Sequence, residues 1–112
     1  MIMSKENLTL NETFDLAFKN HQNNNLQDAQ NYYQKVLEID PDHAATNNNL
    51  GVIFKDLGET QKAKEYYKKA IEVNPNYADA HNNLGIILIE LKEYQKAKDC
   101  YEKTIEISPN HL

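Results

Sequence analysis

Residues 44–77 read AATNNNLGVIFKDLGETQKAKEYYKKAIEVNPNY, and the rest of the 112-residue chain follows the plan of this stretch. Its landmark residues recur 34 positions earlier and 34 positions later. The recurring sets are Pro41, Pro75 and Pro109; Leu16, Leu50 and Leu84; Ala29, Ala63 and Ala97; and Tyr33, Tyr67 and Tyr101. A fixed period of about 20–50 residues is typical of a stacked repeat array. The sequence therefore predicts three similar units packed side by side.

Each unit is expected to contain two helices joined by a short turn. In the middle unit, apolar residues at three- and four-residue spacing predict helices over 44–57 and 60–73. Gly58 allows the chain to reverse between them. Asn74-Pro75 ends the second helix, because the residue before a proline is pushed away from helical geometry. The same reasoning predicts further helices over about 10–22, 26–39, 77–91 and 94–107. The predicted fold is all-α, with six helices in three antiparallel pairs.

The boundaries of the units follow from the period. They are expected at residues 10–43, 44–77 and 78–112, after a polar lead over residues 1–9. Thr9 and Glu12 fit a capping box, in which the hydroxyl and the carboxylate each accept a hydrogen bond from a backbone N–H at a helix start. The first helix is therefore expected to begin directly after Thr9.

Small residues at equivalent positions indicate where helices approach one another closely. Gly51 and Gly85 stand at the same place in the second and third units, and Ala17 stands there in the first. Ala63 and Ala97 are expected to allow the same close approach on the second helices, with Tyr67 and Tyr101 filling the space beside them. A larger side chain at such a contact would overpack it.

Composition excludes several classes of function. The net charge is −5, and all twelve basic residues are lysines, so a phosphate-binding groove for nucleic acid is not expected. No stretch approaches the roughly 20 apolar residues that span a bilayer, and the N-terminus lacks the pattern of a secretory signal. Cys100 is the single cysteine and forms no intramolecular disulfide. These features favour a cytoplasmic protein.

No catalytic residue, metal ligand or cofactor site is expected. The four histidines, His21, His43, His81 and His111, are scattered, with no pair four positions apart and no cysteine pair for zinc. Cys100 has the character of a packing residue on a second helix. The glycines stand at helix contacts and a turn, so they form no phosphate loop.

Two units carry a more specific pattern. The second reads Leu50-Gly51-x-x-Phe54, Ala63-x-x-x-Tyr67 and Pro75, and the third reads Leu84-Gly85-x-x-Leu88, Ala97-x-x-x-Tyr101 and Pro109. This pattern resembles the tetratricopeptide repeat (TPR), which has a 34-residue period. The first unit resembles it more loosely, with Ala17 in place of the glycine and Asn20 in place of the aromatic residue. The resemblance covers about residues 10–112.

The resemblance implies a right-handed α-solenoid in which the first helices line a concave groove and the second helices lie on the convex side. It also implies a protein or peptide partner and no chemistry. The family's groove positions correspond to Asn11, Phe14, Asp15, Phe18, His21 and Gln22 in the first unit. In the second and third units they correspond to Ala45, Asn48, Asn49, Val52, Lys55, Asp56, Asp79, Asn82, Asn83, Ile86, Ile89 and Glu90.

Asparagines are the first notable feature of these positions. Asn49 and Asn83 are one repeat apart, with Asn48 and Asn82 alongside, so they are expected to stack as a ladder of amides. Each amide offers a donor and an acceptor to the backbone of an extended peptide. This resembles the asparagine ladder in the TPR arrays of O-linked N-acetylglucosamine transferases, although Asp15 interrupts it in the first unit. Alternatively, the asparagines cap helices and crosslink neighbouring repeats.

Apolar residues are the second feature. Phe18, Val52 and Ile86 occupy equivalent positions, with Phe14 and Ile89 nearby. They form either an exposed stripe that binds a partner or part of the core between adjacent helices.

Charge is the third feature. The groove positions hold Asp15, Asp56, Asp79 and Glu90 against Lys55, which favours a neutral or basic peptide. Chaperone-tail binders of the family resemble one another in a clamp of Lys, Arg and Asn for a C-terminal carboxylate. The corresponding positions here hold Phe14, Phe18, Asn49, Asp79 and Asn83, so no carboxylate clamp is expected.

The C-terminal end of the array lacks a capping helix within this sequence. We expect it to expose Ile87, Leu91, Tyr101 and Ile105, which suggests either a longer protein or self-association into a homo-oligomer. Two functions remain open. One is a non-enzymatic scaffold that binds an extended peptide in the groove. The other is an N-terminal targeting or oligomerisation module of a larger enzyme, such as a glycosyltransferase or sulfotransferase.

Overall fold

The computed structural model describes residues 8–110, and these residues form six α-helices. The helices are α1 (Leu10–Gln22), α2 (Leu26–Ile39), α3 (Ala44–Asp56), α4 (Thr60–Val73), α5 (Ala78–Glu90) and α6 (Tyr94–Ile107). The all-α, six-helix prediction is confirmed, and each helix begins and ends within one residue of the expected positions. His111 and residues 1–7 of the expected polar lead lie outside the described residues.

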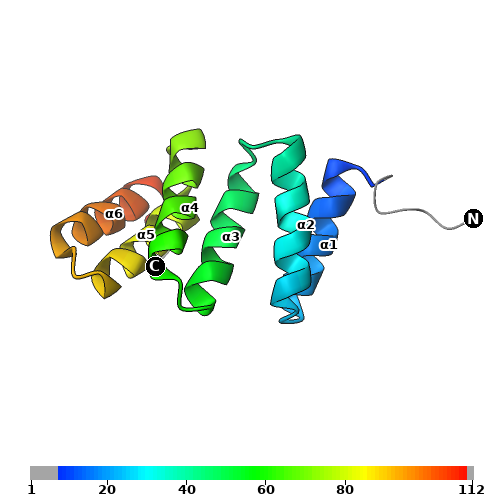
Figure 1. Ribbon diagram of the computed structural model, residues 1–112. Helices are drawn as coiled ribbons and strands as arrows, with labels where there is room; N and C mark the ends of the chain where they lie inside the picture. The colour runs from blue at the N-terminus through cyan, green and yellow to red at the C-terminus, as the bar shows by residue number, and fades with distance from the viewer. Residues whose placement is uncertain (1–7, 111–112) are drawn as a thin grey trace, which may run out of the picture.

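The helices form three antiparallel pairs that follow one another along an elongated α-solenoid (Figure 1). The pairs are α1 with α2, α3 with α4, and α5 with α6. The molecule measures 55 × 26 × 22 Å, with α1 and α2 at one end and α5 and α6 at the other. Between pairs, α2 packs on α3 and α4 packs on α5. The turns are short because breakers such as Pro41 and Pro75 closely follow the second helices.

One core runs through all three pairs. Its buried members include Ala17, Ala29 and Tyr33 from the first pair, and the equivalent small residues and tyrosines recur in the second. The full cluster is completed by Leu50, Ile53, Phe54, Ala63, Tyr67, Leu84, Ile87, Leu88 and Ala97. The repeats are therefore joined by burial of apolar surface rather than standing as separate domains.

The glycines of the first helices admit tyrosines from the second helices. A Cβ atom added at Gly51 would lie 2.5 Å from Cε1 of Tyr67, whose side chain is fully buried. At Gly85 the added atom would lie 2.9 Å from Cε1 of Tyr101, which is partly exposed. The expected close approach at the two glycines is confirmed.

The C-terminal end is less exposed than expected. Ile87 was expected on this uncovered side, but its side chain is 0% exposed. It lies in the core because it occupies the position of Ile53, which is also fully buried. Leu91 and Tyr101 are partly buried against the core, and Ile105 is 47% exposed. The prediction for Ile87 was wrong, and Ile105 remains the most exposed of the four.

Capping and turn residues agree with the sequence. The backbone N–H of Glu12 donates to Oγ1 of Thr9 at 3.1 Å, and the backbone N–H of Thr9 donates to Oε1 of Glu12 at 3.0 Å, so the capping box is confirmed. The turn between the helices of each pair contains one residue with positive φ. These residues are Asn24 (61°), Gly58 (79°) and Lys92 (62°). Lysine is the least suited of the three to this conformation, because its Cβ crowds the backbone there.

We expect Lys92→Gly to raise the free energy of unfolding by roughly 0.5–1 kcal/mol, because glycine adopts this conformation without strain. Lys92 is exposed, so the substitution removes little packing. Chemical denaturation followed by circular dichroism would measure the change. The reciprocal Gly58→Lys variant is the control, and it should lose a similar amount. A Lys92→Gly protein no more stable than the parent would contradict the prediction.

Candidate functional site

The expected groove residues belong to the first helices, α1, α3 and α5. We call the surface that they form the first-helix face. Its exposed members are Asn11, Asp15, Phe18, Gln22, Asp56, Asp79, Ile89 and Glu90. Its partly buried members are Phe14, His21, Ala45, Asn49, Val52, Lys55, Asn82, Asn83 and Ile86, and Asn48 is buried.

The α1 end of this face is aromatic. The Phe14 ring lies 6.4 Å from the Phe18 ring, centroid to centroid, with the planes 13° apart. The Phe14 centroid also lies 5.9 Å from that of Tyr33 and 5.1 Å from that of His43. Phe18 remains 44% exposed at the edge of this cluster. A ring held in place by its neighbours and open to solvent on one side is a ready contact for an apolar partner group.

The apolar residues do not form a uniform stripe. Phe18 is exposed, whereas its equivalents Val52 and Ile86 are partly buried, and Val52 packs against the core. Ile89 is 45% exposed near the end of α5. Of the two alternatives that the sequence left open, the surface role fits Phe18 and the core role fits Val52.

Tyr33 links three helices beneath the face. Its ring is fully buried on α2, and its hydroxyl lies 3.3 Å from Nδ1 of His21 on α1. Nδ2 of Asn49 on α3 donates to the same hydroxyl at 3.2 Å. Burial raises the pKa of Tyr33 to about 12 and lowers the pKa of His21. The phenol therefore keeps its proton, and its hydroxyl accepts a hydrogen bond from Asn49 while lying at hydrogen-bond distance from Nδ1 of His21.

Asn83 makes a different contact. Its Nδ2 donates to Oδ1 of Asn48 at 3.1 Å, joining α5 to α3. Asn48 is only 5% exposed, so it holds Asn83 from below rather than facing a ligand directly. In the first unit the position of Asn48 holds Phe14, which offers no amide oxygen, and Asn49 bonds the tyrosine hydroxyl instead. The two amides are therefore held in different ways, and their Nδ2 atoms crosslink helices as the second alternative expects. The peptide-binding ladder stays a prediction.

This difference leaves Tyr67 without a partner. Tyr67 is the equivalent of Tyr33, but its buried hydroxyl makes no hydrogen bond within residues 8–110. Burial raises its pKa above the ordinary value, and the nearby negative charges of Asp56 and Glu90 add to the effect. The sequence showed the period of these tyrosines but assigned them to packing alone. The hydroxyl of Tyr33 also holds the Asn49 amide of the face, whereas that of Tyr67 holds none.

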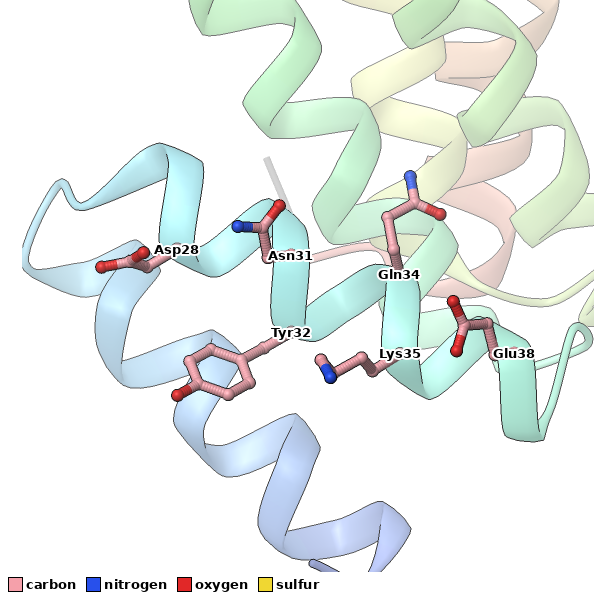
Figure 2. A pocket seen from close by; sticks show the side chains of 6 residues that line it. All are labelled: Asp28, Asn31, Tyr32, Gln34, Lys35 and Glu38. Atoms are coloured by element: carbon pink, nitrogen blue, oxygen red, sulfur yellow. The ribbon is translucent and has the colours of Figure 1, made fainter. Parts of the chain in front are cut away.

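Metal sites, membrane spans and further pockets are the remaining classes of site. Within residues 8–110, no group of three or more His, Cys, Asp or Glu side chains lies close enough to hold a metal ion. None of the described helices has both the length and the apolar character needed to cross a bilayer. A polar hollow of about 380 Å³ lies on α2 and is lined by residues of that helix alone (Figure 2).

Comparison with known proteins identifies the family. The model of the tetratricopeptide repeat family matches residues 8–76 and, in an overlapping second match, residues 42–110. The chain belongs to the tetratricopeptide repeat family. TPR modules are generally non-catalytic, and they bind protein or peptide partners. No curated protein sequence matches the chain.

Solved TPR structures share the fold. MamA superposes with a TM-score of 0.85 at 29% identity, over 92% of this chain and 60% of the MamA chain. The first TPR of Spaghetti (RPAP3), bound to the HSP90 peptide SRMEEVD, gives 0.87 at 21% identity, over 92% of this chain and 82% of that one. A Thermobaculum terrenum O-GlcNAc transferase mutant gives 0.87 at 19% identity, over 98% of this chain but only 21% of the transferase. The TPR chain thus spans less than two thirds of MamA and of the transferase.

Proposed function

We propose that this TPR chain is a non-enzymatic scaffold that holds an extended, neutral-to-basic peptide segment on its first-helix face. The proposal rests on how two amide side chains are hydrogen-bonded. Asn49 and Asn83 are each fixed through Nδ2, by Tyr33 and Asn48 respectively. These two bonds leave the Oδ1 atoms unused, and both side chains are partly exposed. Two fixed acceptors, one on α3 and one on α5, suit the N–H groups of an extended backbone.

Charge and shape supply the rest of the preference. The exposed carboxylates are Asp15, Asp56, Asp79 and Glu90, whereas Lys55 is the matching cation. An acidic segment would meet like charge there, and a neutral or basic one would not. Phe18 and Phe14 at the α1 end suit an apolar side chain of the segment. The first TPR of Spaghetti binds an acidic HSP90 peptide, SRMEEVD. The face described here favours neutral or basic peptides instead.

The direct test is an array of short peptides of acidic, neutral and basic composition. Neutral and basic peptides should bind, and the strongest of them is then titrated against variants by calorimetry. We expect Asn49→Ala and Asn83→Ala each to weaken binding by about tenfold, since each removes one hydrogen bond to the peptide backbone. Asn31→Ala, an exposed asparagine on α2, is the control and should change nothing.

Two results would overturn the proposal. One is undiminished binding by the Asn49→Ala, Asn83→Ala double variant, which would remove the amides from the recognition surface. The other is an array on which acidic peptides bind best or no peptide binds. Circular dichroism on each variant separates lost binding from lost structure.

A second function has one observation in its favour. The Thermobaculum terrenum O-GlcNAc transferase contains a region of the same fold that this chain covers, within a much longer protein. The chain could accordingly serve as the N-terminal targeting or oligomerisation module of a larger enzyme. The coding sequence downstream of Leu112 decides between the two functions: a catalytic domain there supports the module, and a stop codon excludes it.

A further inference from the structure

A second surface lies away from the first-helix face, where α4, α5 and α6 meet. It is a cleft of about 360 Å³ between these helices. Leu84 and Leu88 of α5 and Cys100 of α6 are its apolar lining. Lys64 and Lys68 of α4 and Lys96 and Asp99 of α6 are its charged lining. Cys100 is partly buried, and burial raises the pKa of its thiol.

The same place one repeat earlier is filled by the protein itself. There the Tyr66 ring of α4 stacks on the Phe54 ring of α3, with centroids 5.4 Å apart and planes 11° apart. Nε2 of Gln34 on α2 donates to the Tyr66 hydroxyl at 3.2 Å. The ammonium group of Lys62 lies 4.7 Å from the centre of the Phe54 ring. A tyrosine side chain thus occupies the space between α2 and α4.

Three substitutions along the repeat create the cleft. The position of Tyr66 becomes Cys100, that of Phe54 becomes Leu88, and that of Gln34 becomes Lys68. In the first unit this second-helix position is again a tyrosine, Tyr32, which also packs against the core (Figure 2). The third unit therefore lacks an aromatic ring that the other two supply. The space left corresponds to the place where the partly buried Tyr66 ring lies one repeat earlier, and it keeps an apolar lining of Leu84, Leu88 and Cys100.

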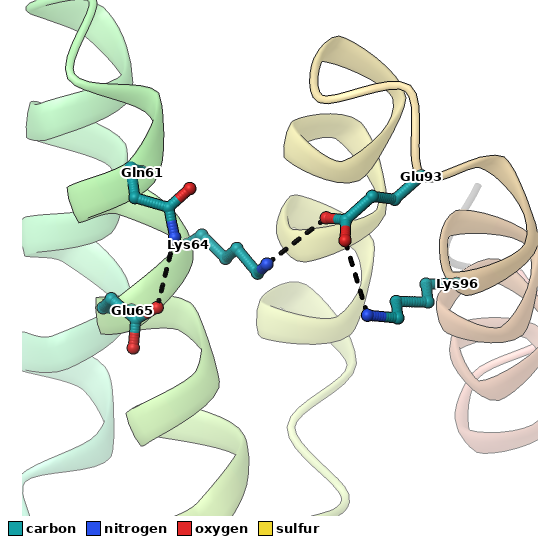
Figure 3. Close-up of polar contacts among 5 residues, drawn as sticks. All are labelled: Gln61, Lys64, Glu65, Glu93 and Lys96. Carbon is teal, nitrogen blue, oxygen red and sulfur yellow. Dashed lines mark hydrogen bonds and ion pairs between the residues drawn. The ribbon is translucent and has the colours of Figure 1, made fainter.

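The charged residues around the cleft are mostly basic, whereas the chain as a whole is acidic. Lys64 and Lys96 both bind the carboxylate of Glu93, at 3.2 and 3.4 Å (Figure 3). These contacts hold the pKa of Glu93 below its ordinary value, and the hydrogen bond from Lys64 contributes most. Lys68 makes no ion pair with any residue that the structure describes. Three lysines therefore outnumber the two acidic residues at the cleft, Glu93 and Asp99, although the net charge of the chain is −5.

We propose that this cleft is a docking site for an aromatic side chain on an acidic segment of a partner protein. The ring would take the place that Tyr66 takes one repeat earlier, against Leu88 and Cys100. Lys68, which replaces the neutral Gln34, would meet the acidic residues beside that ring. The site uses α4, α5 and α6 and selects acidic segments, so it is independent of the first-helix face and does not rest on the function proposed for it.

Three synthetic peptides test the proposal on the whole chain: acetyl-Glu-Glu-Tyr-Glu-Glu-amide, its Tyr→Ala analogue and its Glu→Lys analogue. Cys100 is the single cysteine, so its rate of alkylation by iodoacetamide reports directly on occupation of the cleft. We expect the acidic tyrosine peptide to slow alkylation. By calorimetry it should bind at least about tenfold more tightly than either analogue, since one lacks the ring and the other carries the repelled charge.

Variants of the protein separate the ring from the charge. Cys100→Tyr restores the residue of the preceding repeat, so it should fill the cleft and abolish binding. Lys98→Gln, at an exposed lysine of α6 that does not line the cleft, is the control and should bind as the parent does. Lys68→Gln replaces an exposed lysine by the neutral residue that stands at the equivalent position, Gln34. It should weaken binding by about tenfold without affecting the fold. The Asn49→Ala, Asn83→Ala protein should bind this peptide normally, which distinguishes the two surfaces.

Any of three results would overturn the proposal. Equal affinity for the alanine analogue would show that no ring enters the cleft. Equal affinity for the lysine analogue would show that the ammonium groups select nothing. Full binding by a folded Cys100→Tyr protein would place the peptide elsewhere on the molecule.

Discussion

Gly51→Ala is expected to lower the free energy of unfolding by about 2 kcal/mol. The new methyl group would lie 2.5 Å from Cε1 and 2.6 Å from Cδ1 of Tyr67, both well inside contact distance. Tyr67 is fully buried in the core that joins the helix pairs, so its ring has nowhere to move. Overpacking of this kind costs about 1–3 kcal/mol. The middle pair has neighbours on both sides, which prevents it from relaxing by a shift of one helix.

Gly85→Ala is the matched control, with an expected cost of less than about 1 kcal/mol. There the contact is 2.9 Å, and Tyr101 is partly exposed on the last pair, so the ring can tilt away. The first unit has Ala17 at the equivalent position, in the same core as the buried Tyr33, and α1 lies at an end of the array (Figure 1). Urea denaturation of both variants measures the difference. Equal losses at the two glycines would contradict the argument from burial of the tyrosine ring.

Tyr67→Phe and Tyr33→Phe are expected to differ in their effect on the free energy of unfolding. Tyr33→Phe removes a hydroxyl that accepts from Asn49 and lies against His21, so it should cost about 1–2 kcal/mol. Tyr67→Phe removes a buried hydroxyl without a hydrogen bond in residues 8–110, so it should leave stability unchanged or raise it by about 1 kcal/mol. The two substitutions are chemically identical and stand one repeat apart. Their difference therefore isolates the hydrogen bonding of the hydroxyl.

Denaturation of the two phenylalanine variants under identical conditions gives this difference directly. Asn49→Ala in the Tyr33→Phe background supplies the control for the shared hydrogen bond: its further cost should be smaller than the cost of Asn49→Ala alone. A Tyr67→Phe protein as destabilised as the Tyr33→Phe protein would show that the Tyr67 hydroxyl does have a stabilising partner.

Local signals in the sequence were sufficient for the helices. The capping residue Thr9, the reversal at Gly58 and the prolines after the second helices each act within a few residues, and the observed helix ends lie beside them. The close approach at Gly51 was also predictable, because a small residue recurs there at the repeat period, whereas the residue that approaches it, Tyr67, is shown by the structure. The burial of Ile87 could have been read from Ile53, since equivalent positions share the interior of their own helix pair.

Features that depend on a neighbouring repeat were not predictable from the period. Asn49 and Asn83 are equivalent in sequence, yet one bonds a tyrosine hydroxyl and the other an amide. The cause is the residue presented by the preceding first helix, Phe14 in one case and Asn48 in the other. The cleft beside Cys100 has the same origin. The replacement of a tyrosine was visible in the sequence, but its consequence required the stacking of Tyr66 on Phe54 to be seen.

The aromatic rings of α1 and the amides of α3 and α5 break the translational symmetry of the array. In a solenoid with identical repeats, an extended ligand could slide by one unit and find the same contacts. Here a shift of one unit would move an apolar side chain from the exposed Phe18 to the partly buried Val52. A peptide N–H that moved from Asn49 to Asn83 would likewise meet an amide that is held by Asn48 rather than by a tyrosine hydroxyl. A peptide bound as proposed would therefore have one direction and one preferred register on this surface.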